Sequence, residues 1–142
     1  MSEELMEVTT DTTELVSAQS TTVNIMASFD LTTDDGRAKA YNAGIAADEK
    51  IEDHIGETIG MVDFYIEPIN AVNDATGEME TRAHSVIFAS DGRTYESQSK
   101  GILSSLSRLD SLYNFAERTE PLPITFAERK AKLGRMYIIK LA

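Results

Sequence analysis

The residues that could perform chemistry are arranged as alternating cations and aromatics, not as a catalytic cluster. In an extended run such as Met79 to Ser90, every second side chain points to the same face. Cations beside aromatic rings are typical of surfaces that bind single-stranded nucleic acid. Any base can stack on a ring, for about 1–3 kcal/mol each, while the cations contact phosphates. With the following strand, this face would carry Arg82, His84, Val86, Phe88, Arg93, Tyr95 and Ser97.

A hairpin at Asp91-Gly92 would bring these side chains together. Asp-Gly favours a two-residue type I′ turn, which needs positive φ at both central residues. The register predicted from that turn places Phe88 opposite Tyr95. The pattern is also compatible with the reverse orientation, in which the core receives Val86, Phe88 and Tyr95, and solvent receives Ala83, Ser85, Ile87 and Ala89.

Two further groups could extend such a surface. Tyr65 alternates with apolar residues in the expected strand at residues 60–67 and is a stacking candidate. The turn at residues 129–135 carries four cations in seven positions. We expect Lys130, Lys132 and Arg135 to contact phosphates. The same turn is also compatible with an ordinary soluble hairpin.

Hydrophobic periodicity predicts a mainly β domain. A strand is expected at 23–29, a turn at 30–36, and a short acidic helix at 48–55 that ends at Gly56. Ser99 can cap a helix that runs to about Leu112 and turns leucines and an isoleucine toward the core. Further strands are expected at 60–67, 79–90, 93–97, 122–129 and 136–141.

Three strands, a helix and two strands follow the element order of the OB-fold, a five-stranded Greek-key barrel. We therefore predict one OB-fold-like domain at residues 23–142, with the helix between barrel strands 3 and 4. Residues 23–56 would form an N-terminal elaboration of this domain. Residues 1–22, which are acidic and lack aromatics, are expected to be a disordered tail. An SH3-like barrel or a small α+β sandwich is the structural alternative.

The formal net charge of −11 is unevenly distributed along the chain. Residues 1–80 hold 18 acidic and 3 basic side chains, whereas residues 81–142 hold 6 acidic and 10 basic ones. The basic half favours a nucleic-acid surface. The acidic half supports a second hypothesis, an acidic protein-interaction module such as a host-protein inhibitor or a DNA mimic.

The signatures of common catalytic and metal sites are missing. The sequence has no cysteine and no dinucleotide-binding, P-loop or serine-hydrolase motif. His54 and His84 are far apart in sequence, and the acidic loop at 73–78 lacks the first carboxylate of an EF-hand. We therefore expect neither enzyme activity nor a cofactor or metal. No segment approaches the roughly 20 apolar residues that a membrane helix needs. The start of the chain does not resemble a signal peptide. These features predict a cytoplasmic protein.

The segment from Gly92 to Gly101, its following helix and the strand from Gly134 to Leu141 resemble small phage-encoded single-stranded-DNA-binding proteins. The resemblance covers about residues 55–142. In that family, Tyr-x-x-x-Ser-Lys-Gly leads into the barrel helix, and a basic glycine-containing turn precedes the last strand. The matching positions here are Tyr95, Ser99, Lys100, Gly101 and Gly134. Bacterial-type relatives carry an acidic tail at the C-terminus, whereas this chain is acidic at its N-terminus.

Together, these observations predict non-catalytic binding of single-stranded DNA during phage replication or recombination, in the host cytoplasm. The acidic tail would compete with DNA or attract partners such as replication proteins. The residues expected to touch DNA are Tyr65, Arg82, His84, Phe88, Arg93, Tyr95, Lys130, Lys132 and Arg135.

Overall fold

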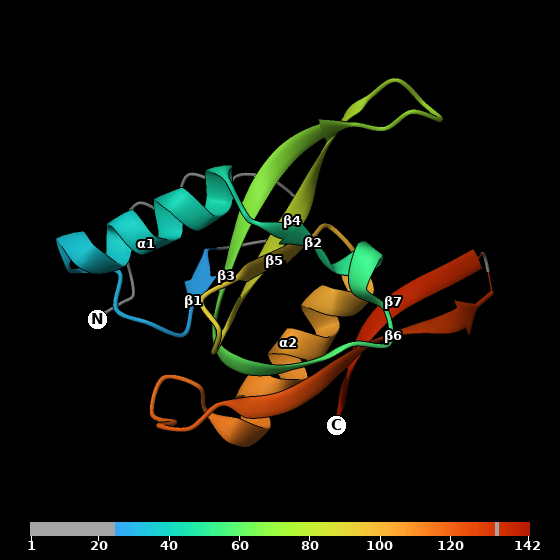
Figure 1. Ribbon diagram of the computed structural model, residues 1–142. Helices are drawn as coiled ribbons and strands as arrows, with labels where there is room; N and C mark the ends of the chain where they lie inside the picture. The colour runs from blue at the N-terminus through green and yellow to red at the C-terminus, as the bar shows by residue number, and fades with distance from the viewer. Residues whose placement is uncertain (1–24, 133) are drawn as a thin grey trace.

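One mixed, curled β-sheet with two helices forms the body of the protein, as the computed structural model shows (Figure 1). The structure describes residues 25–132 and 134–142, so the predicted tail at 1–22 lies outside it. The strands are β1 (Met26–Ala27), β2 (Glu49–Lys50), β3 (Thr58–Val72), β4 (Met79–Ala89), β5 (Thr94–Ser97), β6 (Leu122–Ala131) and β7 (Gly134–Leu141). The helices are α1 (Asp34–Ile45), the short 3₁₀ helix η2 (Ile51–His54) and α2 (Lys100–Tyr113).

The strand order of the sheet is compatible with an OB-like fold but does not match the predicted barrel. The order is β2-β5-β4-β3-β6-β7, and β1 pairs with β3. The five expected strands are β3 to β7, with α2 between β5 and β6. The prediction of a five-stranded Greek-key barrel is matched only in part, because β5 pairs with β2 instead of β7 and the sheet also includes the short strands β1 and β2. The sheet is therefore a half-barrel.

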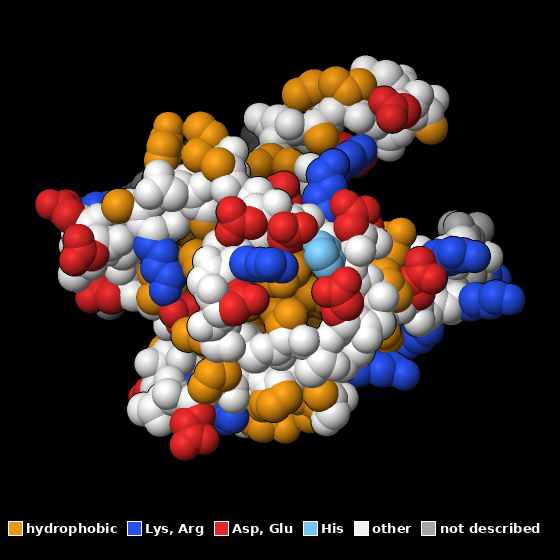
Figure 2. Space-filling model, viewed as in Figure 1, with side chains coloured by type: hydrophobic (Ala, Val, Ile, Leu, Met, Phe, Trp, Pro, Cys, Tyr) orange, Lys and Arg blue, Asp and Glu red, His pale blue; other side chains and the backbone are white. Residues whose placement is uncertain are grey.

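Two long hairpins project from this body as separate arms (Figures 1 and 2). The outer parts of β3 and β4 form the first arm. The outer parts of β6 and β7, residues 127–132 and 134–138, form the second, which we call the basic arm. The arms can diverge because β6 pairs with β3 only from Thr58 to Met61, next to an irregularity in the β3–β4 register. Beyond these four residues, each hairpin continues without the other.

Helix α2 fills the opening of the half-barrel, as its apolar stripe predicted. Ile102, Leu106 and Leu109 are buried in the core, and Leu103 packs against it. The Ser99 hydroxyl accepts a hydrogen bond from the Gly101 N–H at 3.2 Å, which confirms the predicted cap. The core side chains are Ile51, Met61, Phe64, Ile66, Ala83, Ile87, Ala89, Tyr95, Ile102, Leu106, Leu109, Phe115, Leu122, Ile124, Phe126 and Ile139.

The first two turns of α2 are anchored on the outer edge of β7. The Ser105 hydroxyl accepts a hydrogen bond from the Ile139 N–H at 3.0 Å, and the Ser99 hydroxyl donates to the Tyr137 carbonyl at 3.5 Å. A Cβ at Gly101 would lie 2.1 Å from that carbonyl oxygen. Only glycine therefore permits this approach of helix and strand.

Strand β3 runs past Pro68, although the sequence predicted that it ends there. Ser28 lies along the edge of β3 that faces away from β4. There its N–H donates to the Phe64 carbonyl, and its hydroxyl accepts from the Phe64 N–H. Pro68 lies four residues further along β3, so its backbone faces the same outer edge. Its missing N–H therefore removes no hydrogen bond from the β3–β4 pairing.

The β4–β5 hairpin forms, but the predicted two-residue turn is wrong. Its loop has three residues, because the Ala89 N–H bonds to the Arg93 carbonyl and Gly92 alone adopts a positive φ of 93°. This loop needs one residue with positive φ, whereas a type I′ turn needs two. The pairing is shifted by one, so Thr94 faces Phe88 and Tyr95 faces Ile87.

The N-terminal elaboration contains a helix that the sequence did not reveal. Residues 30–36 were expected to be a turn, but Thr33 caps α1 there by accepting from the Gly36 N–H at 3.0 Å. The buried face of α1 consists of Gly36, Ala40 and Ala43, which are too small to give an apolar periodicity. The strand expected at 23–29 is limited to β1 among the described residues.

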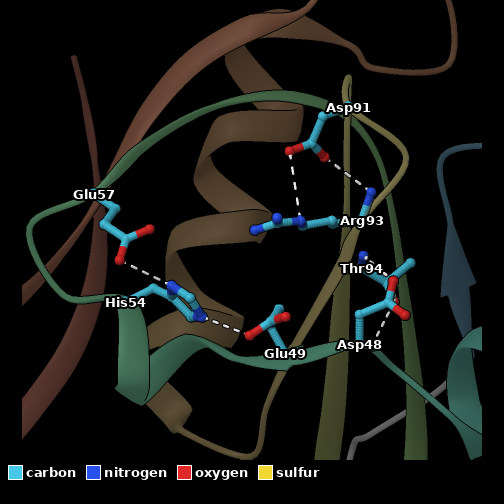
Figure 3. A network of polar contacts seen from close by, with 7 residues as sticks. All are labelled: Asp48, Glu49, His54, Glu57, Asp91, Arg93 and Thr94. Carbon is cyan, nitrogen blue, oxygen red and sulfur yellow. Dashed lines mark hydrogen bonds and ion pairs between the residues drawn. The ribbon is translucent and has the colours of Figure 1, made fainter.

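The predicted acidic helix at 48–55 is β2 followed by η2, and it is held in place by a clamp on His54 (Figure 3). The His54 ring nitrogens lie 2.8 Å from a Glu49 carboxylate oxygen and 2.9 Å from one of Glu57. These hydrogen bonds raise the pKa of His54 above its ordinary 6.5, and the bond to Glu49 has the largest effect. The His54 ring also packs edge-on against the Tyr95 ring.

Replacing Gly101 with alanine tests the contact between α2 and β7. At an unconstrained helix position, Gly→Ala stabilises by roughly 1 kcal/mol. At residue 101 we expect a loss of roughly 1–3 kcal/mol, because the new methyl group meets the Tyr137 carbonyl. Urea unfolding measures the difference. The exposed Ser104→Ala in the same helix is the control and should not destabilise.

The His54 clamp predicts a pH dependence of stability. The pKa of His54 is raised in the folded protein, so the charged form of this histidine stabilises the fold. This stabilisation is fully present below pH 6.5 and is lost as the pH rises through the pKa of His54 in the folded protein. The free energy of unfolding of the wild type, relative to His54→Gln, should fall over that interval. Urea unfolding at several pH values measures this, and the variant retains His84 as an internal control. An NMR titration giving His54 a pKa at or below 6.5 would contradict the clamp.

Candidate nucleic-acid interface

The predicted binding face on β4 exists, but α1 and Phe29, which precedes it, cover the sheet on this side. Arg82, Val86 and Phe88 alternate with the core residues of β4, as the period-two pattern indicated. Val86 is nevertheless fully buried. A Cβ added at Gly44 of α1 would lie 2.8 Å from the Glu67 carboxylate, which shows how closely this helix approaches β3. A nucleic acid could reach little of this face while α1 is in place.

The aromatic residues expected to stack bases pack against each other or against protein. Phe29 contacts the rings of Phe88 and Tyr65, with centroid distances of 5.4 and 6.4 Å. The Lys39 ammonium of α1 lies 4.7 Å from the Phe88 centroid and bonds to Asp63 at 2.7 Å. Tyr65 is 7% exposed, and its hydroxyl donates to a Glu67 carboxylate oxygen. Burial is the main cause that raises the pKa of Tyr65, and the Glu67 carboxylate adds to it.

His84 is engaged within the protein rather than available to a ligand. One ring nitrogen lies 3.0 Å from Glu67 and the other 2.7 Å from Glu96. The residue is 6% exposed. Two glutamates on this face make it acidic, which opposes the positive surface expected from the sequence.

The one-residue shift of the hairpin separates the predicted aromatic pair. Tyr95 points into the core, where it is 2% exposed and contacts Phe126. Phe88 lies on the opposite face, so neither predicted orientation of the hairpin is correct for both rings. Arg93 is exposed beside Asp91 (Figure 3). Hydrogen bonding to Tyr95 is the main cause that raises the pKa of the Arg93 guanidinium.

Arg82 lies on the first arm, where its guanidinium already forms hydrogen bonds with neighbouring residues. Its guanidinium donates to Glu80 at 2.6 Å and to the Val72 carbonyl at 3.4 Å. The bond to Arg82 is the main cause that lowers the pKa of Glu80. The side chain of Arg82 remains about one-third exposed.

The basic arm gathers the exposed cations of the predicted turn. Lys130, Lys132 and Arg135 are all exposed on it, together with Arg129. Figure 2 shows Lys and Arg side chains concentrated over this arm, whereas Asp and Glu side chains predominate on the surface of the body in the same view. The arm therefore presents a positive surface on an acidic protein.

The register of β6 and β7 arranges the inner face of the basic arm in layers. Phe126 and Ile139 pair in the core, Glu128 and Tyr137 pair next, and Lys130 and Arg135 pair toward the tip. Because side chains alternate along both strands, the three layers share one face. Sequence reasoning missed Tyr137 and Arg129 as candidates. The signal for Tyr137 was its spacing of two from Arg135 on the same strand.

Within residues 25–132 and 134–142, no group of three or more His, Asp or Glu side chains is arranged to hold a metal ion. None of the helices in the described part of the chain is long and apolar enough to cross a membrane.

Comparison with known proteins gives one result. The model of the Phi29 phage single-stranded DNA-binding protein family matches residues 19–141. No curated protein and no solved structure matches the chain. The match extends beyond the resemblance seen at residues 55–142 to include β1, α1 and η2. The chain therefore belongs to the Phi29 phage single-stranded DNA-binding protein family.

Proposed function

We propose that this protein binds single-stranded DNA without catalysis and protects it during phage DNA replication or recombination in the host cytoplasm. The family match over residues 19–141 is the observation that carries the proposal. The basic arm supplies a surface on which the strand could lie, since exposed cations bind phosphates and release counterions.

The proposed contacts differ from those expected from the sequence. Lys130, Lys132 and Arg135 stay in the proposal as phosphate contacts because they are exposed, and Arg93 and Arg82 could extend the path of the strand. The candidates left out are covered by α1 or buried, namely Tyr65, His84, Phe88 and Tyr95.

The distribution of charge reconciles an acidic protein with an acidic ligand. Bulk repulsion acts over the whole molecule but is screened beyond about 8–10 Å at physiological salt. Contacts with the basic arm act within that distance. The acidic surface of the body would then direct the strand toward the arm. The family match does not favour the alternative of an acidic module that binds a basic protein.

Neutralising the basic arm tests this assignment. The triple variant Lys130→Gln, Lys132→Gln, Arg135→Gln should bind a labelled oligo-dT of about 30 nucleotides more weakly than the wild type. The plot of log affinity against log salt should become shallower by about 2, because each single-strand phosphate contact contributes about 0.7. Fluorescence anisotropy at 50 and 200 mM salt measures both quantities.

The matched control neutralises three exposed cations elsewhere, in the variant Arg37→Gln, Lys50→Gln, Arg108→Gln. This control has the same net charge as the arm variant, so a purely global electrostatic effect would weaken both equally. Unlabelled duplex DNA, added as competitor, should not displace the oligonucleotide. A wild type that fails to bind at 50 mM salt would overturn the proposed function. A binding wild type with an unaffected arm variant would overturn only the assignment to the arm.

A further inference from the structure

We propose that Tyr137 is the base-stacking residue of the basic arm, and that Glu128 competes with DNA phosphate for Arg135. This inference rests on the proposed function, and it gives roles to Tyr137 and Glu128, which the sequence did not single out. It identifies the ligand as an unpaired strand whose bases are accessible, because a tyrosine ring recognises the face that duplex stacking hides.

Tyr137 is placed between the hydrophobic core and the cations of the arm. On its own strand, Ile139 is buried on one side and Arg135 is exposed on the other. Lys130 faces Arg135 across the hairpin. The ring itself is partly buried and packs against the core. A base that stacks on its free part would place its phosphate near two cations.

Tyr137 is a rigid platform because its backbone is anchored on α2 and its ring packs against the core. Its carbonyl is held by the Ser99 hydroxyl, and Gly101 lets the first turn of α2 approach its backbone. A side chain that is already fixed loses little conformational entropy when a base stacks on it. The aromatic residues predicted earlier lack this combination, because Tyr95 is enclosed and Phe88 carries Lys39 over its ring.

Glu128 is the acidic residue of this layer. It faces Tyr137 across the strands, and one of its carboxylate oxygens lies 3.6 Å from the Arg135 guanidinium. The Arg135 side chain is 72% exposed, so this ion pair is weak and can exchange for a phosphate. The carboxylate would thus lower the affinity for DNA while keeping Arg135 oriented in its absence.

The test of stacking compares Tyr137→Leu with Tyr137→Phe in oligo-dT binding at 50 mM salt. Leucine keeps an apolar side chain against the core but removes the ring, so affinity should fall roughly tenfold. Phenylalanine should bind within about twofold of the wild type, because its ring still stacks. Tyr41→Leu, which removes an exposed tyrosine on α1, is the control and should change nothing.

A second readout separates stacking from a loss of phosphate contacts or of folding. The salt dependence of Tyr137→Leu should equal that of the wild type, because stacking releases no counterions. In the wild type, ultraviolet irradiation of the oligo-dT complex should cross-link thymine to Tyr137, as mass spectrometry of the peptides would show. This measurement needs no variant. Normal affinity of Tyr137→Leu, or cross-links confined to other residues, would overturn the inference while leaving the proposed function intact.

The test of competition is Glu128→Gln, which removes the charge and keeps the shape. Affinity for oligo-dT should rise about two- to fivefold, the range expected for an exposed ion pair. Glu117→Gln, at an exposed position after α2, makes the same change in net charge and should raise affinity less. Equal affinities of the two variants would overturn the role of Glu128. A wild type that binds no oligonucleotide would instead overturn the proposed function, and with it this inference.

Discussion

The arrangement of the molecule depends on the contact between the first two turns of α2 and the edge of β7. In a closed barrel, β7 would be held by backbone pairing with β5, but here β5 pairs with β2. The Ser99 and Ser105 hydroxyls and the close approach of Gly101 take the place of that pairing. They fix β7 against the core, and through β7 they fix the direction in which the basic arm leaves the body.

A second constraint is the length of the β4–β5 loop, because it decides which side chains meet. One additional loop residue moves Tyr95 into the core and leaves Phe88 on the outer face. Tyr95 then packs against His54, and this contact joins the N-terminal elaboration to the sheet. Tyr95, which the sequence suggested as a base-stacking residue, instead holds two parts of the fold together.

The sequence predicted that aromatic residues and cations share one face of the sheet, but the structure separates them. The outer face of β3 and β4 is covered by α1, Phe29 and a set of hydrogen-bonded carboxylates around His84. The exposed cations lie instead on the basic arm, whose inner layers continue the core outward. Folding and the proposed binding of DNA therefore use one continuous stack of side chains, with apolar pairs inside and charged pairs at the tip.

The sequence by itself determined the features that depend on local chemistry. These include the strands β3 to β7, the capped helix with its buried stripe, the basic turn and the family. Only the tertiary structure decided the register of the β4–β5 hairpin, the passage of β3 through Pro68 and the covering of the predicted face by α1. The physical reason is that alternation and capping act between neighbours in sequence. The face that a residue presents depends on pairing across strands and on helices whose small buried residues leave no periodic signal.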